Sequence, residues 1–463
     1  MRVLLAAHAL PPDTYGGTEL YTVRLAEAIA DRGHSVTVAA PRGADATVDG
    51  ATVVRLPDPA PTPRPDDGID PAGAEGVVRP AIDAAVADLL EARDPDLVHL
   101  QHLKGLSAGI PTVCADAGVP CIATLHDFWT LCHREQLRRP DGARCSGPDS
   151  LAKCVGCYAD AVGRHVAPAA DDPGMKTRDR WDQREHERDG ESGPRNRLGL
   201  ESVVADPVAR RTDRLRRALT ECDRLVSPSR FLRDVFVEYG TDPNLLVHRR
   251  NGIRTGRFGE STFDPDDPLH VGYAGRIAES KGVHLLLAAL EWLPDADLAV
   301  HVHGRFEPDA EPYHARLRKR AAGEPRVRFH GRYGDAADVF PTFDVFVLPS
   351  VWLENSPLVI QEAFAAGVPV VTGDRGGMAE LVDDGVDGLT VPVGDAAALA
   401  ATLRRLAADP DLVRRLRAGV AEPTTLGDHA DDLLALYREH GPADASEQGG
   451  DETSERGRSV GDA

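Results

Sequence analysis

Two glutamates eight residues apart lie in the run LPSVWLENSPLVIQE, which begins at Leu348. A buried strand is expected just before this run; Glu354 then lies in the following loop and Glu362 about one turn inside the next helix. The order Ser356-Pro357 is typical of an N-cap and a first helical residue. Free N–H groups at a helix start can bind phosphate, and carboxylates can bind hydroxyls. The run favours a sugar-nucleotide site; the plainer alternative is two surface charges that favour the helix start.

Two cations lie in a second run, YAGRIAESKG, which begins at Tyr273. A predicted strand leads into a loop that carries Arg276 and Lys281, and a helix follows. At such a turn an Arg fork and a Lys point charge can clamp a diphosphate. Lys281 is also one of only five lysines in the chain. Solvated loop charges are the alternative.

A glycine pair, Gly16-Gly17, lies in the run PDTYGGTE between the first predicted strand and the first helix. Glycines let the backbone approach a ligand closely, and the helix amides lie behind them. The run is not G-x-G-x-x-G, so it lacks the dinucleotide fingerprint.

Elements that alternate between strand and helix must position these runs. Such alternation is typical of parallel sheets covered by helices, and the chain shows two series of it. We therefore expect an α/β protein of two Rossmann-like, doubly wound domains. The predicted strands are Arg2–Ala7, His34–Ala39, Leu97–Leu100, Pro120–Leu125, Leu269–Tyr273, Leu298–His303, Val327–Phe329, Val345–Leu348 and Val368–Thr372, and the predicted helices are Thr18–Asp31, Gly282–Trp292 and Val359–Ala366.

The domain boundaries follow from lapses in this periodicity. We expect an N-terminal domain over 1–250, a C-terminal domain over 251–440 and a disordered acidic tail over 441–463, with a linker near Thr241–Asp267. The last helix, about Asp428–Tyr437, is expected to cross back to the first domain. The other predicted irregular segments are a loop at Pro57–Ala74 and a polar insertion at Gly163–Arg211.

Taken together and in this order, the runs resemble the family 4 glycosyltransferases (glycosyltransferase group 1), which have the two-domain GT-B fold. The resemblance extends from Met1 to about Leu436, apart from the polar insertion. Its most specific part is Glu354-x7-Glu362 between VLPS and AFAAGVPVVTGDRGGMAELVDDGVDGLTVPVGD; GRIAESKG, GGTE, PSRFL and Asn251-Gly252 also match. The family usually has a glycine after the first glutamate, where this chain has Asn355.

The resemblance implies a role for each matched residue. The N-terminal domain would bind the acceptor and the C-terminal domain the donor nucleotide. Arg276 and Lys281 would hold the donor diphosphate, Glu354 the sugar hydroxyls and Glu362 the ribose, while Gly16 and Gly17 would close over the phosphate beside Ser356, with Glu380 near the same cleft.

His126-Asp127 follows the strand Pro120–Leu125 and resembles the HD pair of the family on the facing domain. A histidine at the carboxyl edge of a sheet can meet sugar hydroxyls or transfer a proton. We expect His126 to contact the donor sugar or act in catalysis, together with Glu354, Arg276 and Lys281. Asp127 is expected to orient His126 or its loop.

Four of the seven cysteines are bunched at Cys132, Cys145, Cys154 and Cys157. The pair Cys154-x2-Cys157 presents two thiolates to one ion, and the two upstream thiolates could complete a tetrahedron. We expect a structural zinc ion, with an iron–sulfur cluster or reduced thiols as alternatives and His133 as a substitute for Cys132. The other three, Cys114, Cys121 and Cys222, are expected in the core. No cofactor is expected to be needed for catalysis.

The charge balance excludes some classes of partner. The chain has 463 residues and a net charge of −21, which argues against nucleic acid and anionic lipid as general partners. The carboxylate surplus with scarce lysine favours a halophile, here an archaeon, over the alternative of a GC-rich genome, which explains only the lysines. No apolar run approaches the length of a membrane span, so a cytoplasmic protein is expected.

The expected reaction is transfer of a sugar from a nucleotide diphosphate-sugar to a hydroxyl of a glycan or lipid-linked acceptor, with retention as the family implies (a hexosyltransferase of EC 2.4). One alternative is a sugar-nucleotide-binding protein without catalysis; a weaker one is an NAD-dependent oxidoreductase. The basic run ARRTDRLRR at Ala209–Arg217 is expected to be a solvated helix face. Its alternative is a peripheral contact with a lipid-linked acceptor or the inner face of a membrane.

Overall fold

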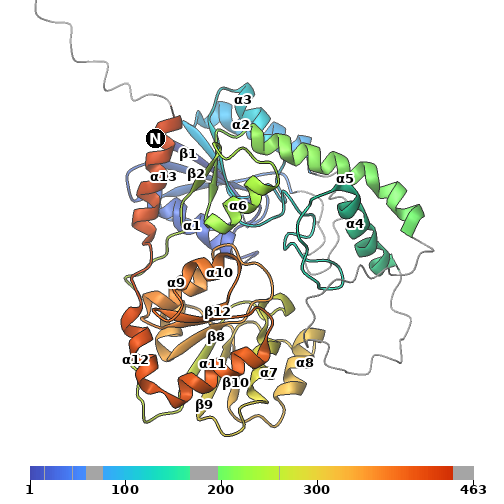
Figure 1. Cartoon of the computed structure of the whole chain (residues 1–463). Helices are drawn as coiled ribbons and strands as arrows, with labels where there is room; N and C mark the ends of the chain where they lie inside the picture. The colour runs from blue at the N-terminus through green and yellow to red at the C-terminus, as the bar shows by residue number, and fades with distance from the viewer. Residues whose placement is uncertain (15, 44, 59–76, 167–196, 260, 442–463) are drawn as a thin grey trace, which may run out of the picture.

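Two parallel sheets, each covered by helices, form the two halves of the molecule (Figure 1). The computed structural model describes the chain apart from residues 15, 44, 59–76, 167–196, 260 and 442–463. The first sheet has the strand order β3-β2-β1-β4-β5-β6-β7 and the second β10-β9-β8-β11-β12-β13. Both orders run outward in two directions from their first strand, as in doubly wound folds. The predicted fold class is confirmed.

The first half consists of short buried strands and the helices that connect them. The strands are β1 (Arg2–Ala6), β2 (Ser35–Ala40), β3 (Ala51–Arg55), β4 (Leu97–Leu100), β5 (Cys121–Thr124), β6 (Arg224–Ser227) and β7 (Leu246–His248). The helices are α1 (Gly17–Ala30), α2 (Pro80–Arg93), α3 (Ile110–Asp116), α4 (Leu151–Val166), α5 (Arg197–Thr220) and α6 (Arg230–Glu238). Helices α4 and α5 pack against each other beside the sheet (Figure 1).

The second half repeats this plan. Its strands are β8 (Leu269–Ala274), β9 (Leu298–His303), β10 (Val327–Gly331), β11 (Val345–Leu348), β12 (Val370–Gly373) and β13 (Gly388–Val391). Its helices are α7 (Val283–Leu290), α8 (Pro312–Ala321), α9 (Leu358–Ala365), α10 (Gly376–Leu381), α11 (Ala396–Ala408) and α12 (Pro410–Gly419), with 3-10 turns η2 (Glu279–Lys281), η3 (Ala336–Asp338) and η4 (Phe340–Thr342).

The last helix, α13 (Leu426–His440), crosses back to the first half as expected and packs against α1 (Figure 1). Leu433, Leu434 and Tyr437 on α13 join the same core as Leu25 and Ile29 on α1. Helix α13 is therefore part of the hydrophobic core of the first domain.

Two predicted segments differ from the structure. The linker near Thr241–Asp267 contains β7, which completes the first sheet. The polar insertion Gly163–Arg211 ends inside the long helix α5, because the apolar residues Val204 and Val208 pack against α4. The predicted loop Pro57–Ala74 lies largely, and the predicted tail almost entirely, outside the described residues. None of the described helices is both long enough and apolar enough to cross a bilayer.

Candidate active site

Each sheet reverses its strand order at one point, and the ends of these strands face each other across the two domains. The reversal lies between β1 and β4 in the first sheet and between β8 and β11 in the second. Ligands of doubly wound sheets bind outside the carboxyl ends of the strands at this point. His102 follows β4, Lys281 follows β8 and Glu354 follows β11, so residues that could carry chemistry gather there.

Lys281 and Glu354 form an ion pair at the edge of the second sheet. Lys281 Nζ lies 2.5 Å from Glu354 Oε1, and Ser350 Oγ donates to the same oxygen over 2.7 Å. Glu354 is only 4% exposed, so its charge is compensated inside the protein. Gly282 makes this approach possible, because a Cβ there would lie 1.8 Å from the carbonyl oxygen of Pro349. The sequence placed these two residues in one donor site, but it paired Lys281 with Arg276 rather than with Glu354.

The other predicted donor residues surround this pair. Glu362 is buried on α9, and Arg24 of α1 lies 3.6 Å away (Nη1 to Oε1) from the opposite domain. Burial raises the pKa of Glu362, against the effect of Arg24. Arg276 is exposed, and its side chain forms no ion pair with any residue that the structure describes. Its loop is fixed by Tyr273, whose hydroxyl donates to the Arg276 carbonyl over 2.7 Å.

The predicted N-cap at Ser356 is wrong. Helix α9 begins at Leu358 with Pro357 at the N-cap, because proline holds an extended backbone there (φ −66°, ψ 114°). The hydroxyl of Ser356 is buried and has no hydrogen-bond partner among the described residues. It lies next to the start of α9.

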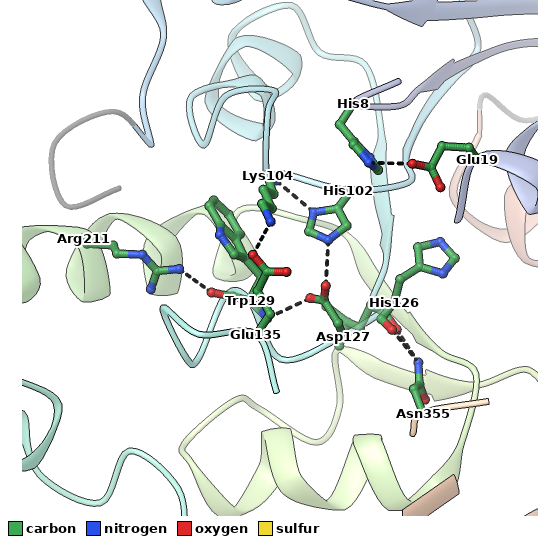
Figure 2. Close-up of polar contacts among 11 residues, drawn as sticks. His8, Glu19, His102, Lys104, His126, Asp127, Trp129, Glu135, Arg211 and Asn355 are labelled. Atoms are coloured by element: carbon green, nitrogen blue, oxygen red, sulfur yellow. Dashed lines mark hydrogen bonds and ion pairs between the residues drawn. The ribbon is translucent and has the colours of Figure 1, made fainter. Parts of the chain in front are cut away.

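His126 lies at the carboxyl end of β5, as predicted, and Figure 2 shows Asn355 directed at its backbone carbonyl. Its Nε2 lies 3.3 Å from Gln101 Oε1, and its ring packs edge-on against Tyr21 with the ring centroids 5.2 Å apart. Burial, with a smaller effect of His102, lowers the pKa of His126 to about 3. The imidazole is therefore neutral near pH 7, which suits a hydrogen-bonding group rather than an acid.

Asp127 orients the loop but not His126. Its Oδ2 lies 3.1 Å from His102 Nε2, and its Oδ1 accepts from Trp129 N over 2.8 Å. Burial opposes ionisation, yet the charge and hydrogen bond of His102 lower the pKa of Asp127. Figure 2 shows two further pairs on this edge, His8–Glu19 and Lys104–Glu135. Sequence reasoning missed both, because the partners of each pair lie on different elements or loops and no local pattern relates them.

The glycine pair lies at the start of α1, where Gly16 is the N-cap and Gly17 the first helical residue. A Cβ at Gly16 would lie 2.3 Å from the Glu19 carboxylate, whereas one at Gly17 would meet nothing within 4 Å. The Glu19 carboxylate therefore already lies beside Gly16 at the N-terminus of α1, and the space next to Gly17 is open.

The structural zinc ion expected at Cys132, Cys145, Cys154 and Cys157 stays a prediction. Across the described parts of the chain, no group of three or more His, Cys, Asp or Glu side chains could hold a metal ion. Cys132 and Cys145 pack against the core of the first sheet, whereas Cys154 packs where α4 meets α5. Burial, with smaller effects of the neighbouring Cys132 and Cys145, raises the pKa of Cys154 to about 11 and that of Cys157 to about 12. Cys114, Cys121 and Cys222 are buried, as predicted.

The basic run Ala209–Arg217 lies on α5, but Arg211 is not solvated. Arg211 is buried and donates to the backbone carbonyl of Trp129, as Figure 2 shows. Its Cζ lies 4.9 Å from the centroid of the Trp129 ring. Arg211 therefore braces the loop that carries Asp127.

Comparison with known proteins identifies both halves. Residues 15–147 match the model described as Glycosyltransferase Family 4, and residues 268–409 match Glycosyl transferases group 1. The D-inositol 3-phosphate glycosyltransferase of Streptomyces bingchenggensis is 34% identical over 43% of this chain and 48% of its own length. The alpha-maltose-1-phosphate synthase of Mycobacterium tuberculosis is 32% identical over 47% of this chain and 57% of its own. The matched region thus spans about half the length of these relatives.

Solved structures match over nearly the whole chain. Anabaena Alr3699/HepE in complex with UDP has a TM-score of 0.63 at 17% identity, covering 95% of this chain and 100% of that one. Sucrose-phosphate synthase from Thermosynechococcus elongatus has a TM-score of 0.63 at 19% identity, covering 95% and 98%. At these identities the match shows the fold. The chain therefore has the GT-B fold, and its two halves match the models of Glycosyltransferase Family 4 and of Glycosyl transferases group 1.

Proposed function

We propose that the protein transfers a sugar from a nucleotide diphosphate-sugar to an acceptor hydroxyl, with retention of anomeric configuration. The observation that carries this proposal is that the Lys281–Glu354 pair of one domain lies opposite the His126 loop of the other. Asn355, which follows Glu354 in the chain, donates to the carbonyl oxygens of that loop. A donor held by the second domain would have its anomeric carbon between these groups. Both family models describe glycosyltransferases, which removes the basis for the oxidoreductase alternative.

On the donor side, the diphosphate would lie near Lys281, Arg276 and the start of α9. Lys281 supplies positive charge next to a buried carboxylate, and Arg276 is exposed in the adjoining loop. The unpartnered Ser356 hydroxyl can donate to a phosphate oxygen, and Glu362 can accept from ribose hydroxyls. Support for this class of donor comes from the Anabaena neighbour, whose structure holds UDP.

On the acceptor side, the first sheet offers buried polar atoms without partners among the described residues: His8 Nδ1, Gln101 Nε2 and Thr130 Oγ1. Buried groups left unpaired cost about 1–3 kcal/mol each, so hydroxyls of a bound sugar would stabilise this edge. His126, which stays neutral, would bind a hydroxyl. With retention, the attacking hydroxyl and the departing phosphate oxygen share one face of the sugar, and the proton can pass between them.

The test starts with donor binding. UDP-, GDP- and ADP-sugars are added to the purified protein, and binding is read as a rise in Tm. The donor that binds is then incubated with glycan and lipid-linked acceptors, and the product linkage is determined. We expect turnover to persist in EDTA, because the residues themselves neutralise the diphosphate. Failure of all three nucleotide classes to raise Tm would contradict the proposal.

A further inference from the structure

Asn355 connects the two domains through both ends of its side-chain amide. It is only 6% exposed. Its Nδ2 donates to the carbonyl oxygens of Leu125 (3.0 Å) and His126 (3.2 Å), and its Oδ1 accepts from Ser229 Oγ over 2.7 Å. Figure 2 shows Asn355 beneath the His126 loop. The three partners lie in the first domain, whereas Asn355 follows β11 of the second.

The backbone around Asn355 is fixed in the second domain. Gly377 N donates to the Glu354 carbonyl over 2.7 Å, and a Cβ on Gly377 would lie 1.3 Å from the Asn355 carbonyl oxygen. The loop and the start of α10 are therefore in close contact. Within this rigid loop, Glu354 binds Lys281 and the next residue reaches the other domain.

A second contact from α10 reinforces the first. The Glu380 carboxylate accepts from Arg230 N and Phe231 N, each over 3.0 Å, at the start of α6. The N-cap of α6 is Ser229, which also donates to Asn355. The free backbone N–H groups at the start of α6, in the first domain, thus donate to a carboxylate of the second domain. The predicted cleft residue Glu380 acts here as a helix cap.

We propose that Asn355 is a positioning residue, which holds the His126 loop against the Glu354–Lys281 pair when the domains are closed. The inference rests on the proposed function. An amide is suited to this place because it donates to two carbonyls and accepts from one hydroxyl at once. A glycine, usual at this position in the family, would leave all three without this partner. A carboxylate would face two carbonyl oxygens without a proton to donate.

The test compares Asn355→Gly and Asn355→Asp with the wild type. We expect kcat to fall about tenfold or more in both, because Asn355→Gly removes all three buried hydrogen bonds and Asn355→Asp removes the two to the carbonyl oxygens. The KM for the donor should stay within about threefold, since the donor residues lie on the second domain. Asn244→Asp, the same chemical change at an exposed position, is the matched control and should leave kcat and Tm unchanged.

A double-mutant cycle identifies the route of the effect. If Asn355 acts through the His126 loop, Asn355→Gly should cost little further kcat in a His126→Ala background. The inference would be overturned if the losses in kcat of the two single variants multiplied in the double variant. It would also be overturned if both Asn355 variants kept kcat within twofold of the wild type. Should one variant fail to fold, the other still decides. A wild type that binds and transfers no sugar would instead refute the proposed function.

Discussion

Lys281 and Glu354 form an ion pair in which each side chain compensates the charge of the other. Glu354 is almost fully buried, so removal of Lys281 leaves its carboxylate with Ser350 as the remaining side-chain partner among the described residues. We expect Lys281→Met to lower the free energy of unfolding by about 1–3 kcal/mol as well as abolishing most turnover. The double variant Lys281→Met/Glu354→Gln removes both charges and should recover most of the stability but none of the activity. Urea unfolding and kcat are measured on both variants. Equal instability of the double variant would show that the pair matters for packing rather than charge.

At the level of single residues, sequence reasoning succeeded where position follows from chain order. Lys281 and Glu354 each follow a strand, and neighbouring parallel strands end at the same edge, so their approach could be predicted. The contacts of Asn355 could not, because its partners lie more than a hundred residues away. Its departure from the usual glycine was the available signal. Ser356 was misplaced by one residue, a shift within the ordinary uncertainty of helix ends.

Three neighbouring strands of the second sheet carry a row of histidines. His270 Nδ1 lies 2.9 Å from His301 Nε2, and His301 Nδ1 lies 3.0 Å from His330 Nε2. The His303 and His330 rings stack with their centroids 4.3 Å apart. A neutral His301 can satisfy both contacts, because it donates from one ring nitrogen and accepts with the other. Burial and the neighbouring imidazoles lower the pKa of His301 and of His303 to about 4.

This row predicts loss of stability in acid. Both folded pKa values lie below the usual 6.5, so between pH 6.5 and 4 the unfolded chain binds more protons than the folded one. Stability is therefore retained above pH 6.5 and falls as the pH drops through this interval, by about 1.4 kcal/mol per pH unit for each proton taken up. We expect His301→Asn to show a shallower fall of Tm between pH 7 and 4.5. An unchanged slope would contradict the role of the row.

Short strands could be predicted where the whole run is apolar or nearly so, as in β4 and β11, which have four residues each. The strands β6 (RLVS) and β7 (LVH) were missed, because each contains only two apolar residues. Helix α5 is polar overall, and its burial depends on α4 and on Trp129. In both cases the structure of the segment depends on the elements it packs against. A local sequence pattern carries no information about those partners.

The core of the molecule is closed by its last helix. Leu433 of α13 is fully buried beside Leu25 of α1, and Tyr437 Oη lies 2.5 Å from His99 Nδ1 on β4. We expect Leu433→Ala to destabilise the protein by about 2–5 kcal/mol, because it opens a cavity in the first domain. Asp432→Ala, on the exposed side of the same turn, should change stability by less than about 0.5 kcal/mol. Urea unfolding measures both, and equal effects would contradict the packing of α13.

The net charge of −21 acts on the molecule as a whole. Carboxylates spread over the surface repel each other at low ionic strength, and the unfolded chain relieves this repulsion by expanding. The Debye length falls from about 30 Å at 0.01 M salt to about 3 Å at 1 M, so added salt screens the folded state most. We propose that the protein is adapted to concentrated salt and expect its Tm to rise with KCl, steeply below 0.5 M. Sucrose at matched osmolality, which screens no charge, is the control. A Tm that stays level or falls with KCl would show that local pairs such as Arg32–Asp431, which salt weakens, dominate over the net charge.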